Sequence, residues 1–152
     1  MSIANPSRLH PRLQSTVQGF VDGWRRIGSQ TRFYAKTLGA IPDAVLRRLR
    51  GKRDLGVHTE MFSDGFVELY EAGAITNKYK TVHPGRTVTS FVIGTQRVFD
   101  FVDDNAQVEF HPCDRTNDTS LIRRNDRTVA INSALQIDLT GQVCADSIGH
   151  RI

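Results

Sequence analysis

Glu60 is the residue of this chain whose type and position best suit chemistry. It lies within residues 55–65, where a short apolar run predicts a buried strand and a Ser-Asp-Gly turn leads into an amphipathic helix. Open α/β sheets bind their substrates at the carboxyl ends of strands. A glutamate there could be a general base, a covalent nucleophile, a metal ligand or a cap partner, or simply an exposed side chain.

His58 is the second candidate, because alternation along a strand places it on the same side as Glu60. Its imidazole could be a general base or a metal ligand, or a histidine packed on a strand. One histidine and one glutamate do not make a catalytic zinc site, which needs about three protein ligands. His83 and His111 each precede a proline and are interpreted as loop residues, so the sequence predicts no metal site.

Hydrophobic periodicity predicts the elements that position these side chains. Strands are expected at residues 55–57, 88–93, 108–110, 128–131 and 135–139, with residues 142–145 continuing the same sheet. Helices are expected at residues 41–49, 66–70 and 96–102. A further short helix is expected to begin with a cap at Asn117 or Asp118 and to run through residue 122. This alternation predicts an α/β fold, a mostly parallel sheet with flanking helices. Right-handed crossovers align strand carboxyl ends, so one edge is expected to carry Glu60, Gly94, His111 and Asn132.

The composition is ordinary for a globular protein, with 39% hydrophobic and 24% charged residues in a chain of 152. No apolar run approaches the roughly 20 residues of a membrane helix, and residues 1–10 lack the apolar core of a secretory signal. Cys113 and Cys144 have no metal-type spacing and are expected to be reduced. These features predict a cytoplasmic protein that does not bind membranes.

The charge is unevenly distributed along the chain. Residues 1–53 hold 11 of the 20 basic but only 2 of the 16 acidic residues. This could mark a nucleic-acid-binding arm, an organellar transit peptide or a solvated leader. The aromatic residues here do not follow the order of a known nucleic-acid-binding module. We therefore expect no nucleic-acid partner, and we interpret residues 1–36 as an unrelated, poorly ordered leader that precedes a domain at residues 37–152.

Five ordered blocks resemble a known family, whereas no dinucleotide-binding fingerprint, P-loop or nucleophile elbow is present. The blocks are Gly39-Ala-Ile-Pro-Asp-Ala-Val-Leu46, residues 55–65, Val108-Glu-Phe-His-Pro112, Val129-Ala-Ile-Asn-Ser-Ala134 and residues 138–149. From about Gly39 to Ile152 the chain resembles the acetyl-CoA hydrolase/transferase family, and within it the 4-hydroxybutyrate and butyrate:acetate CoA-transferase branch.

The resemblance implies a partial second, C-terminal domain of a cytoplasmic enzyme built from two similar α/β domains. It implies that Glu60 is the nucleophile that attacks an acyl-CoA thioester and then carries CoA as a glutamyl thioester, and that Gly39 contributes to CoA binding. The implied partners are an acyl-CoA and a short-chain carboxylate, in acetate and short-chain acyl-CoA metabolism. Coenzyme A would be a substrate, with no permanently bound cofactor.

The chain also departs from the family pattern. Thr37 stands where the family has the first glycine of a Gly-x-Gly pair that ends at Gly39. The first domain is absent, and the chain stops before the glycine-rich block expected next. These departures leave two expectations open: a CoA-transferase catalytic fragment, or a non-catalytic remnant or interaction subunit, either of them as a homo-oligomer or with a complementing chain. Uncovered sheet edges and apolar faces would lower the stability of such a fragment.

Overall fold

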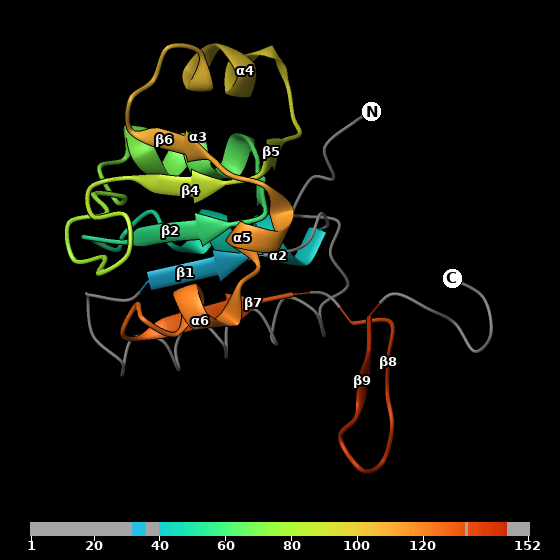
Figure 1. Ribbon diagram of the computed structural model, residues 1–152. Helices are drawn as coiled ribbons and strands as arrows, with labels where there is room; N and C mark the ends of the chain where they lie inside the picture. Colours follow the sequence, from blue (N-terminus) through green and yellow to red (C-terminus); the bar gives the residue numbers. More distant parts are fainter. Residues whose placement is uncertain (1–31, 36–39, 133, 146–152) are drawn as a thin grey trace.

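A computed structural model describes residues 32–35, 40–132 and 134–145, with side chains from residue 43 onward. Its centre is a five-stranded sheet in the order β6-β4-β2-β1-β7, and every neighbouring pair is parallel (Figure 1). The strands are β1 (Arg32–Ala35), β2 (Gly56–Thr59), β4 (Thr87–Thr89), β6 (Val108–Phe110) and β7 (Thr128–Ile131). The predicted α/β fold with a mostly parallel sheet and flanking helices is confirmed.

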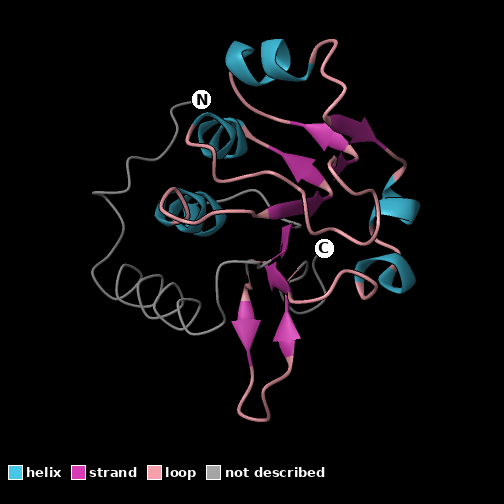
Figure 2. Ribbon diagram, turned by 90° about the vertical axis from the view of Figure 1, so that its left-hand side faces the viewer, coloured by secondary structure: helices cyan, strands magenta, loops and turns pink. Residues whose placement is uncertain are grey.

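Helices cover both faces of this sheet (Figure 2). On one face lie α2 (Ala40–Arg48) and α3 (Asp64–Glu71), which form the main apolar core with Val57 of β2. The short helices α5 (Cys113–Thr116) and α6 (Thr119–Ile122) lie on the opposite face, and α4 (Gln96–Val102) packs beside α3. Successive strand residues point to opposite faces, so Val57 enters the core and His58 faces α5.

Two strands continue past the main sheet after a one-residue interruption. β3 (Met61–Phe62) follows β2 after Glu60, and β5 (Phe91–Val92) follows β4 after Ser90. These two extensions pair in parallel with each other. At the interruption, the Glu60 carbonyl accepts hydrogen bonds from the backbone N–H groups of Ser90 (2.9 Å) and Phe91 (3.1 Å). The backbone of Glu60 is therefore held between two paired segments.

Most predicted elements are found close to their expected positions. The helix at residues 96–102 and the strands at residues 108–110 and 128–131 have the expected bounds. The strand expected at residues 88–93 is divided at Ser90 into β4 and β5, and α5 was not expected. Residues 32–35 lie within the stretch interpreted as a leader, yet the structure pairs them as β1 between β2 and β7.

The expectation that residues 142–145 continue the main sheet is wrong. β8 (Gln136–Ile137) and β9 (Val143–Cys144) form a separate antiparallel hairpin. Asp138 sets the turn, since its Oδ1 accepts hydrogen bonds from the N–H groups of Thr140 (2.8 Å) and Gln142 (2.9 Å). Gly141 has a φ of 87°, which glycine adopts readily, so the chain reverses direction between β8 and β9.

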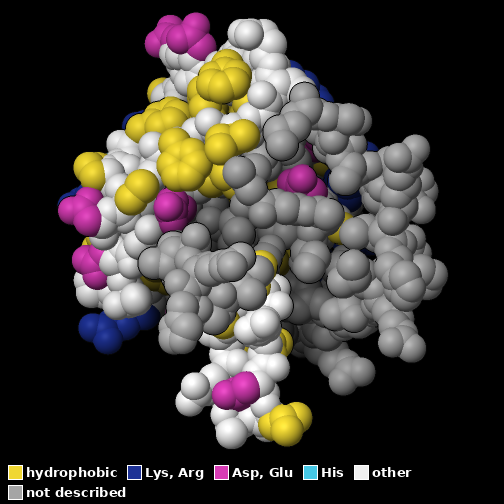
Figure 3. Space-filling model, turned by 90° about the vertical axis from the view of Figure 1, so that its right-hand side faces the viewer, with side chains coloured by type: hydrophobic (Ala, Val, Ile, Leu, Met, Phe, Trp, Pro, Cys, Tyr) yellow, Lys and Arg dark blue, Asp and Glu magenta, His cyan; other side chains and the backbone are white. Residues whose placement is uncertain are grey.

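An apolar patch lies on the side toward which the parallel strands point. Phe91, Ile93, Phe99 and Phe110 are between 38% and 49% exposed. Apolar side chains gather in the upper part of this face (Figure 3). No helix in the described part of the chain is both long enough and apolar enough to cross a bilayer.

Candidate active site

Glu60 lies at the carboxyl end of β2, in the interior of the sheet, as its position in the sequence predicts. Its side chain is partly buried. Both neighbours of β2 are parallel strands, so the carboxylate stands at an edge where strand ends and the loops after them converge. The Thr89 hydroxyl, whose single proton is shared between the carbonyl oxygens of Glu60 (3.2 Å) and Phe91 (3.1 Å), adds to the two backbone donors that fix the Glu60 peptide group.

Asn117 holds the carboxylate itself. Its Nδ2 donates a hydrogen bond of 2.9 Å to Oε2 of Glu60, although the two residues are 57 positions apart in sequence. Asn117 follows α5 directly and forms its C-cap. A neutral amide donor orients a carboxylate without forming an ion pair, and this bond occupies only one of the two carboxylate oxygens.

His58 anchors the helix that carries Asn117. Its Nε2 lies 2.7 Å from the backbone carbonyl oxygen of Thr116, the last residue of α5. A carbonyl only accepts, so Nε2 carries the proton and donates. His58 and Glu60 thus contact consecutive residues, Thr116 and Asn117, as expected for side chains on one face of a strand.

The surroundings of His58 keep its imidazole neutral. The side chain is 5% exposed, and burial lowers its pKa from the usual 6.5 to about 4, assisted by the positive charges of Lys80, His83 and His111. The hydrogen bond to Thr116 opposes this shift. At neutral pH His58 is therefore an uncharged donor that positions α5, and so weak a base does not suit the general-base role considered from the sequence.

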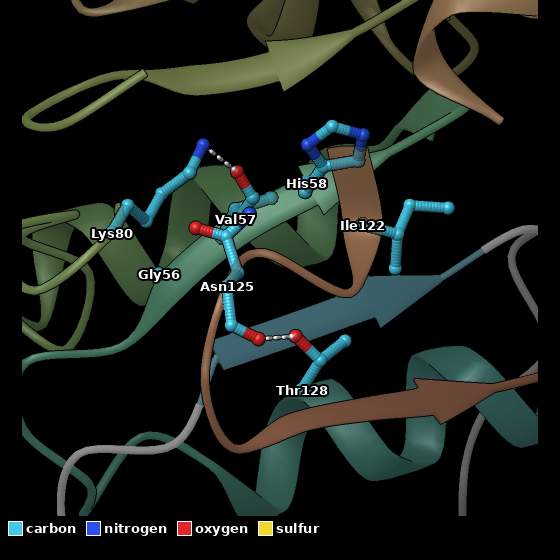
Figure 4. A pocket seen from close by; sticks show the side chains of 7 residues that line it. All are labelled: Gly56, Val57, His58, Lys80, Ile122, Asn125 and Thr128. Atoms are coloured by element: carbon cyan, nitrogen blue, oxygen red, sulfur yellow. Dashed lines mark hydrogen bonds between the residues drawn. The ribbon is translucent and has the colours of Figure 1, made fainter. Parts of the chain in front are cut away.

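Buried polar side chains also bind the backbone of β2 at Val57, before the residues of the candidate site. Lys80 is 4% exposed, and its Nζ donates to the carbonyl oxygens of Val57 (2.8 Å) and Arg86 (2.6 Å), the first of which is visible in Figure 4. Asn77 is 1% exposed, and its Oδ1 accepts a hydrogen bond of 2.8 Å from the Val57 N–H. These bonds satisfy backbone groups of β2 just before the residues that carry the site.

Two hollows near the sheet do not suit a CoA ester. The cavity in Figure 4 has a volume of about 10 Å³, room for one water molecule at most, and is lined by Gly56, Val57, His58, Lys80, Ile122, Asn125 and Thr128. An open hollow along α4 is lined by Gln96, Phe99, Asp100, Val102, Asp103 and Asp104. Its three carboxylates would repel the phosphates of CoA. Glu60 lines neither hollow.

The other predicted site residues are distributed along the chain. His111 and Asn132 follow β6 and β7 at the same sheet edge as Glu60, whereas Gly94 follows β5 of the smaller sheet. Gly39 lies outside the described residues. A cluster of His83, Glu109 and His111, whose ligand atoms lie within 4.8 Å of one another, was not predicted from the sequence. Only the i, i+2 spacing of Glu109 and His111, which places both on one face of a strand, could have indicated part of it.

Comparison with known proteins identifies relatives of the C-terminal part. Residues 94–152 match the family model of the acetyl-CoA hydrolase/transferase C-terminal domain. The 4-hydroxybutyrate coenzyme A transferase of Clostridium kluyveri is 53% identical over 112 residues, which are 74% of this chain and 26% of that protein. The matched segment spans about a quarter of the length of such curated relatives.

Solved structures show the same likeness. The crystal structure of RipA from Yersinia pestis matches with a TM-score of 0.85 and 32% identity, over 98% of this chain and 33% of that one. The 4-hydroxybutyrate CoA-transferase of Porphyromonas gingivalis matches with a TM-score of 0.73 and 43% identity, over 79% of this chain and 31% of that one. The resemblance inferred from the sequence blocks is confirmed.

Proposed function

We propose that this chain, whose C-terminal part belongs to the acetyl-CoA hydrolase/transferase family, supplies the catalytic glutamate of an acyl-CoA:carboxylate CoA-transferase. The observation that carries the proposal is the position of Glu60. Its carboxylate stands at the carboxyl end of an interior parallel strand, where two backbone N–H groups fix the Glu60 carbonyl and Asn117 holds Oε2 at 2.9 Å. A nucleophile must be oriented in this way before it attacks.

The proposed reaction shares one carboxylate between two acyl groups. A Glu60 oxygen forms a bond to the thioester carbonyl carbon of the acyl-CoA, the carbon–sulfur bond breaks, and CoA leaves as a thiolate, so that the acyl group and Glu60 are joined in a mixed anhydride. The thiolate then attacks the glutamyl carbonyl, which releases the first carboxylate and forms a glutamyl-CoA thioester. A second carboxylate reverses these two steps and departs as the new acyl-CoA. Covalent catalysis divides one difficult exchange into easier steps.

The supporting residues have positioning roles in this proposal. Asn117 orients the carboxylate, and neutral His58 holds Thr116 and hence α5 next to it. We place the reaction in cytoplasmic metabolism of acetate and other short-chain acyl-CoA compounds, with coenzyme A as substrate. We expect a further domain or another chain to strengthen CoA binding, so that Glu60 of this chain alone reacts slowly but still reacts at high acetyl-CoA concentration. The exposed apolar patch of Phe91, Ile93, Phe99 and Phe110 supports that expectation.

Trapping the covalent intermediate tests the proposal. The full chain is incubated with acetyl-CoA, treated with hydroxylamine, and its peptides are mapped by mass spectrometry. We expect a hydroxamate on Glu60, and none at this position in Glu60→Gln. Glu71→Gln is the matched control, because Glu71 lies on the exposed surface of α3 in an ion pair with Arg97. A hydroxamate on a different carboxylate, or no hydroxamate at all, would overturn the proposal.

The hydrogen bond from Asn117 provides a second measurement. Hydrogen bonds to charged groups contribute about 1.5–3 kcal/mol, so Asn117→Ala should slow formation of the Glu60 hydroxamate by about 10- to 100-fold. Circular dichroism of the variant checks that α5 and the sheet remain folded. An unchanged labelling rate in folded Asn117→Ala would show that Asn117 does not position the nucleophile.

A further inference from the structure

We propose that His83, Glu109 and His111 form a binding site for a divalent transition-metal ion, with Zn²⁺ the ion that two imidazoles and a carboxylate fit best. It is the one group of three metal-ligand side chains in the part of the chain that the structure describes. The inference does not depend on the proposed function of Glu60, because the three side chains come from edge strand β6, the residue that follows it and the loop before β4, whereas Glu60 follows the middle strand β2.

The three side chains converge on one oxygen. Oε2 of Glu109 lies 2.5 Å from Nδ1 of His83 and 3.2 Å from Nε2 of His111. Zinc–ligand bonds of about 2.0–2.2 Å place the ligand atoms of a tetrahedral ion roughly 3.3 Å apart. Oε2 of Glu109 is closer than this to both imidazole nitrogens, and all three ligand atoms lie within 4.8 Å of one another. Small side-chain rotations therefore suffice to place an ion between the three atoms.

The backbone presents these side chains before any ion arrives. Glu109 lies within β6, in register with Val88 of β4, and His111 continues the strand with a hydrogen bond of 2.8 Å from its N–H to the Thr89 carbonyl. The i, i+2 spacing puts Glu109 and His111 on the same face of the sheet. His83 belongs to the loop that precedes β4 and reaches this face, where its ring centroid lies 4.8 Å from that of His111.

The second oxygen of the carboxylate is occupied by an outer partner. Nε of Arg86 lies 3.1 Å from Oε1 of Glu109 and leaves Oε2 directed at the two imidazoles. Ligating carboxylates are commonly held by such a partner, which fixes their orientation.

The partial burial of the ligands also suits an ion with one open position. The side chains of His83, Glu109 and His111 are 19%, 27% and 23% exposed, so the cluster is only partly accessible to solvent. Three protein ligands leave the fourth tetrahedral position for water or another small ligand. A bound ion would join the loop that precedes β4 to the edge strand β6, so we expect it to stabilise this side of the sheet.

Metal titration of the full chain tests the proposal. After treatment with EDTA and removal of the chelator, the protein is titrated with ZnCl₂ by calorimetry and with CoCl₂ by visible spectroscopy. We expect one ion per chain, the strong absorption of tetrahedral Co²⁺ and a higher melting temperature with Zn²⁺. The variants His83→Ala, His111→Ala and Glu109→Gln should each weaken Zn²⁺ binding by at least about 10- to 100-fold.

One control separates the cluster from other groups. Glu71→Gln removes an exposed carboxylate from α3 and should bind Zn²⁺ like the unchanged chain. If a variant does not fold, the unchanged chain provides the test. Modification of each histidine by diethyl pyrocarbonate is then mapped with and without Zn²⁺. Bound zinc should protect both His83 and His111.

Three results would overturn the proposal. They are the absence of one-to-one Zn²⁺ binding, unchanged binding in folded His83→Ala or His111→Ala, and equal modification of both histidines with and without Zn²⁺. None of them depends on acyl-CoA, so failure of the metal site and failure of the Glu60 proposal are distinguished by separate measurements.

Discussion

Acidification should destabilise this domain through His58. The imidazole is neutral in the folded protein, with a pKa lowered by burial to about 4, whereas the unfolded chain titrates near 6.5. Between these values the unfolded state binds more protons, so stability rises with pH. The contribution of His58 is therefore fully present above about pH 6.5 and is lost as the pH falls toward 4.

The size of the effect follows from the shift. Each pKa unit corresponds to about 1.4 kcal/mol, and pH 5 lies about 1.5 units below the unfolded pKa, so His58 should remove about 2 kcal/mol of unfolding free energy between pH 7 and pH 5. The perturbing groups that face the imidazole are Lys80, His83 and His111, all of which remain in the comparison below. A loss of about 2 kcal/mol is large against the 5–15 kcal/mol of a typical domain.

Urea denaturation at pH 7, 6 and 5 measures this effect, with His58→Gln as the matched variant. A glutamine amide can still donate to the Thr116 carbonyl but does not titrate, so the pH dependence of the variant should be weaker by about 2 kcal/mol over this range. All other titrating groups are common to both proteins and cancel in the difference. Equal pH dependence of the two proteins would refute the assignment of a neutral, buried His58.

Two further predictions concern stability. Asn77→Ala removes the acceptor of the buried Val57 N–H and the donor to the Tyr70 and Thr87 hydroxyls, and should cost at least about 2 kcal/mol in urea melts. A loss below about 0.5 kcal/mol would contradict this account. Gly94→Ala would press a Cβ against the Asp64 carboxylate, which accepts a hydrogen bond from the Thr95 N–H at the start of α4. This variant should lose about 1–3 kcal/mol of unfolding free energy, measured by thermal melting. Gly51→Ala should lose about 0.5 kcal/mol or less, because nothing lies within 4 Å of the added Cβ. Similar losses of unfolding free energy in both glycine variants would show that the structure relieves the contact between the new Cβ at position 94 and Asp64.

Local pattern predicted the regular elements where their own residues carry the signal. The helix at residues 96–102 has its apolar residues on one face, and residues 108–110 and 128–131 are apolar runs next to turn residues. The strand at residues 32–35 was not predicted from the sequence, because a short central strand is stabilised mainly by its two partner strands. The hairpin turn at Asp138 was missed because it depends on side-chain bonds to the backbone two and four residues later.

The site was predictable in part. Position at a strand end selected Glu60 as a candidate, and alternation placed His58 on the same side. Asn117 was considered only as a helix cap, yet Asp118 forms the side-chain cap of α6 and Asn117 binds Glu60 instead. No local rule connects residues 57 positions apart, so this contact could not be inferred from spacing.

The sequence by itself determined the class of fold, the family resemblance and the choice of Glu60, because periodicity and ordered motif blocks are properties of neighbouring residues. Tertiary structure alone decided that Asn117 holds the carboxylate, that His58 is a neutral anchor, and that His83 meets Glu109 and His111. These contacts depend on the strand order β6-β4-β2-β1-β7, which places distant segments side by side. Strand order results from long-range packing, and hydrophobic patterning leaves it open.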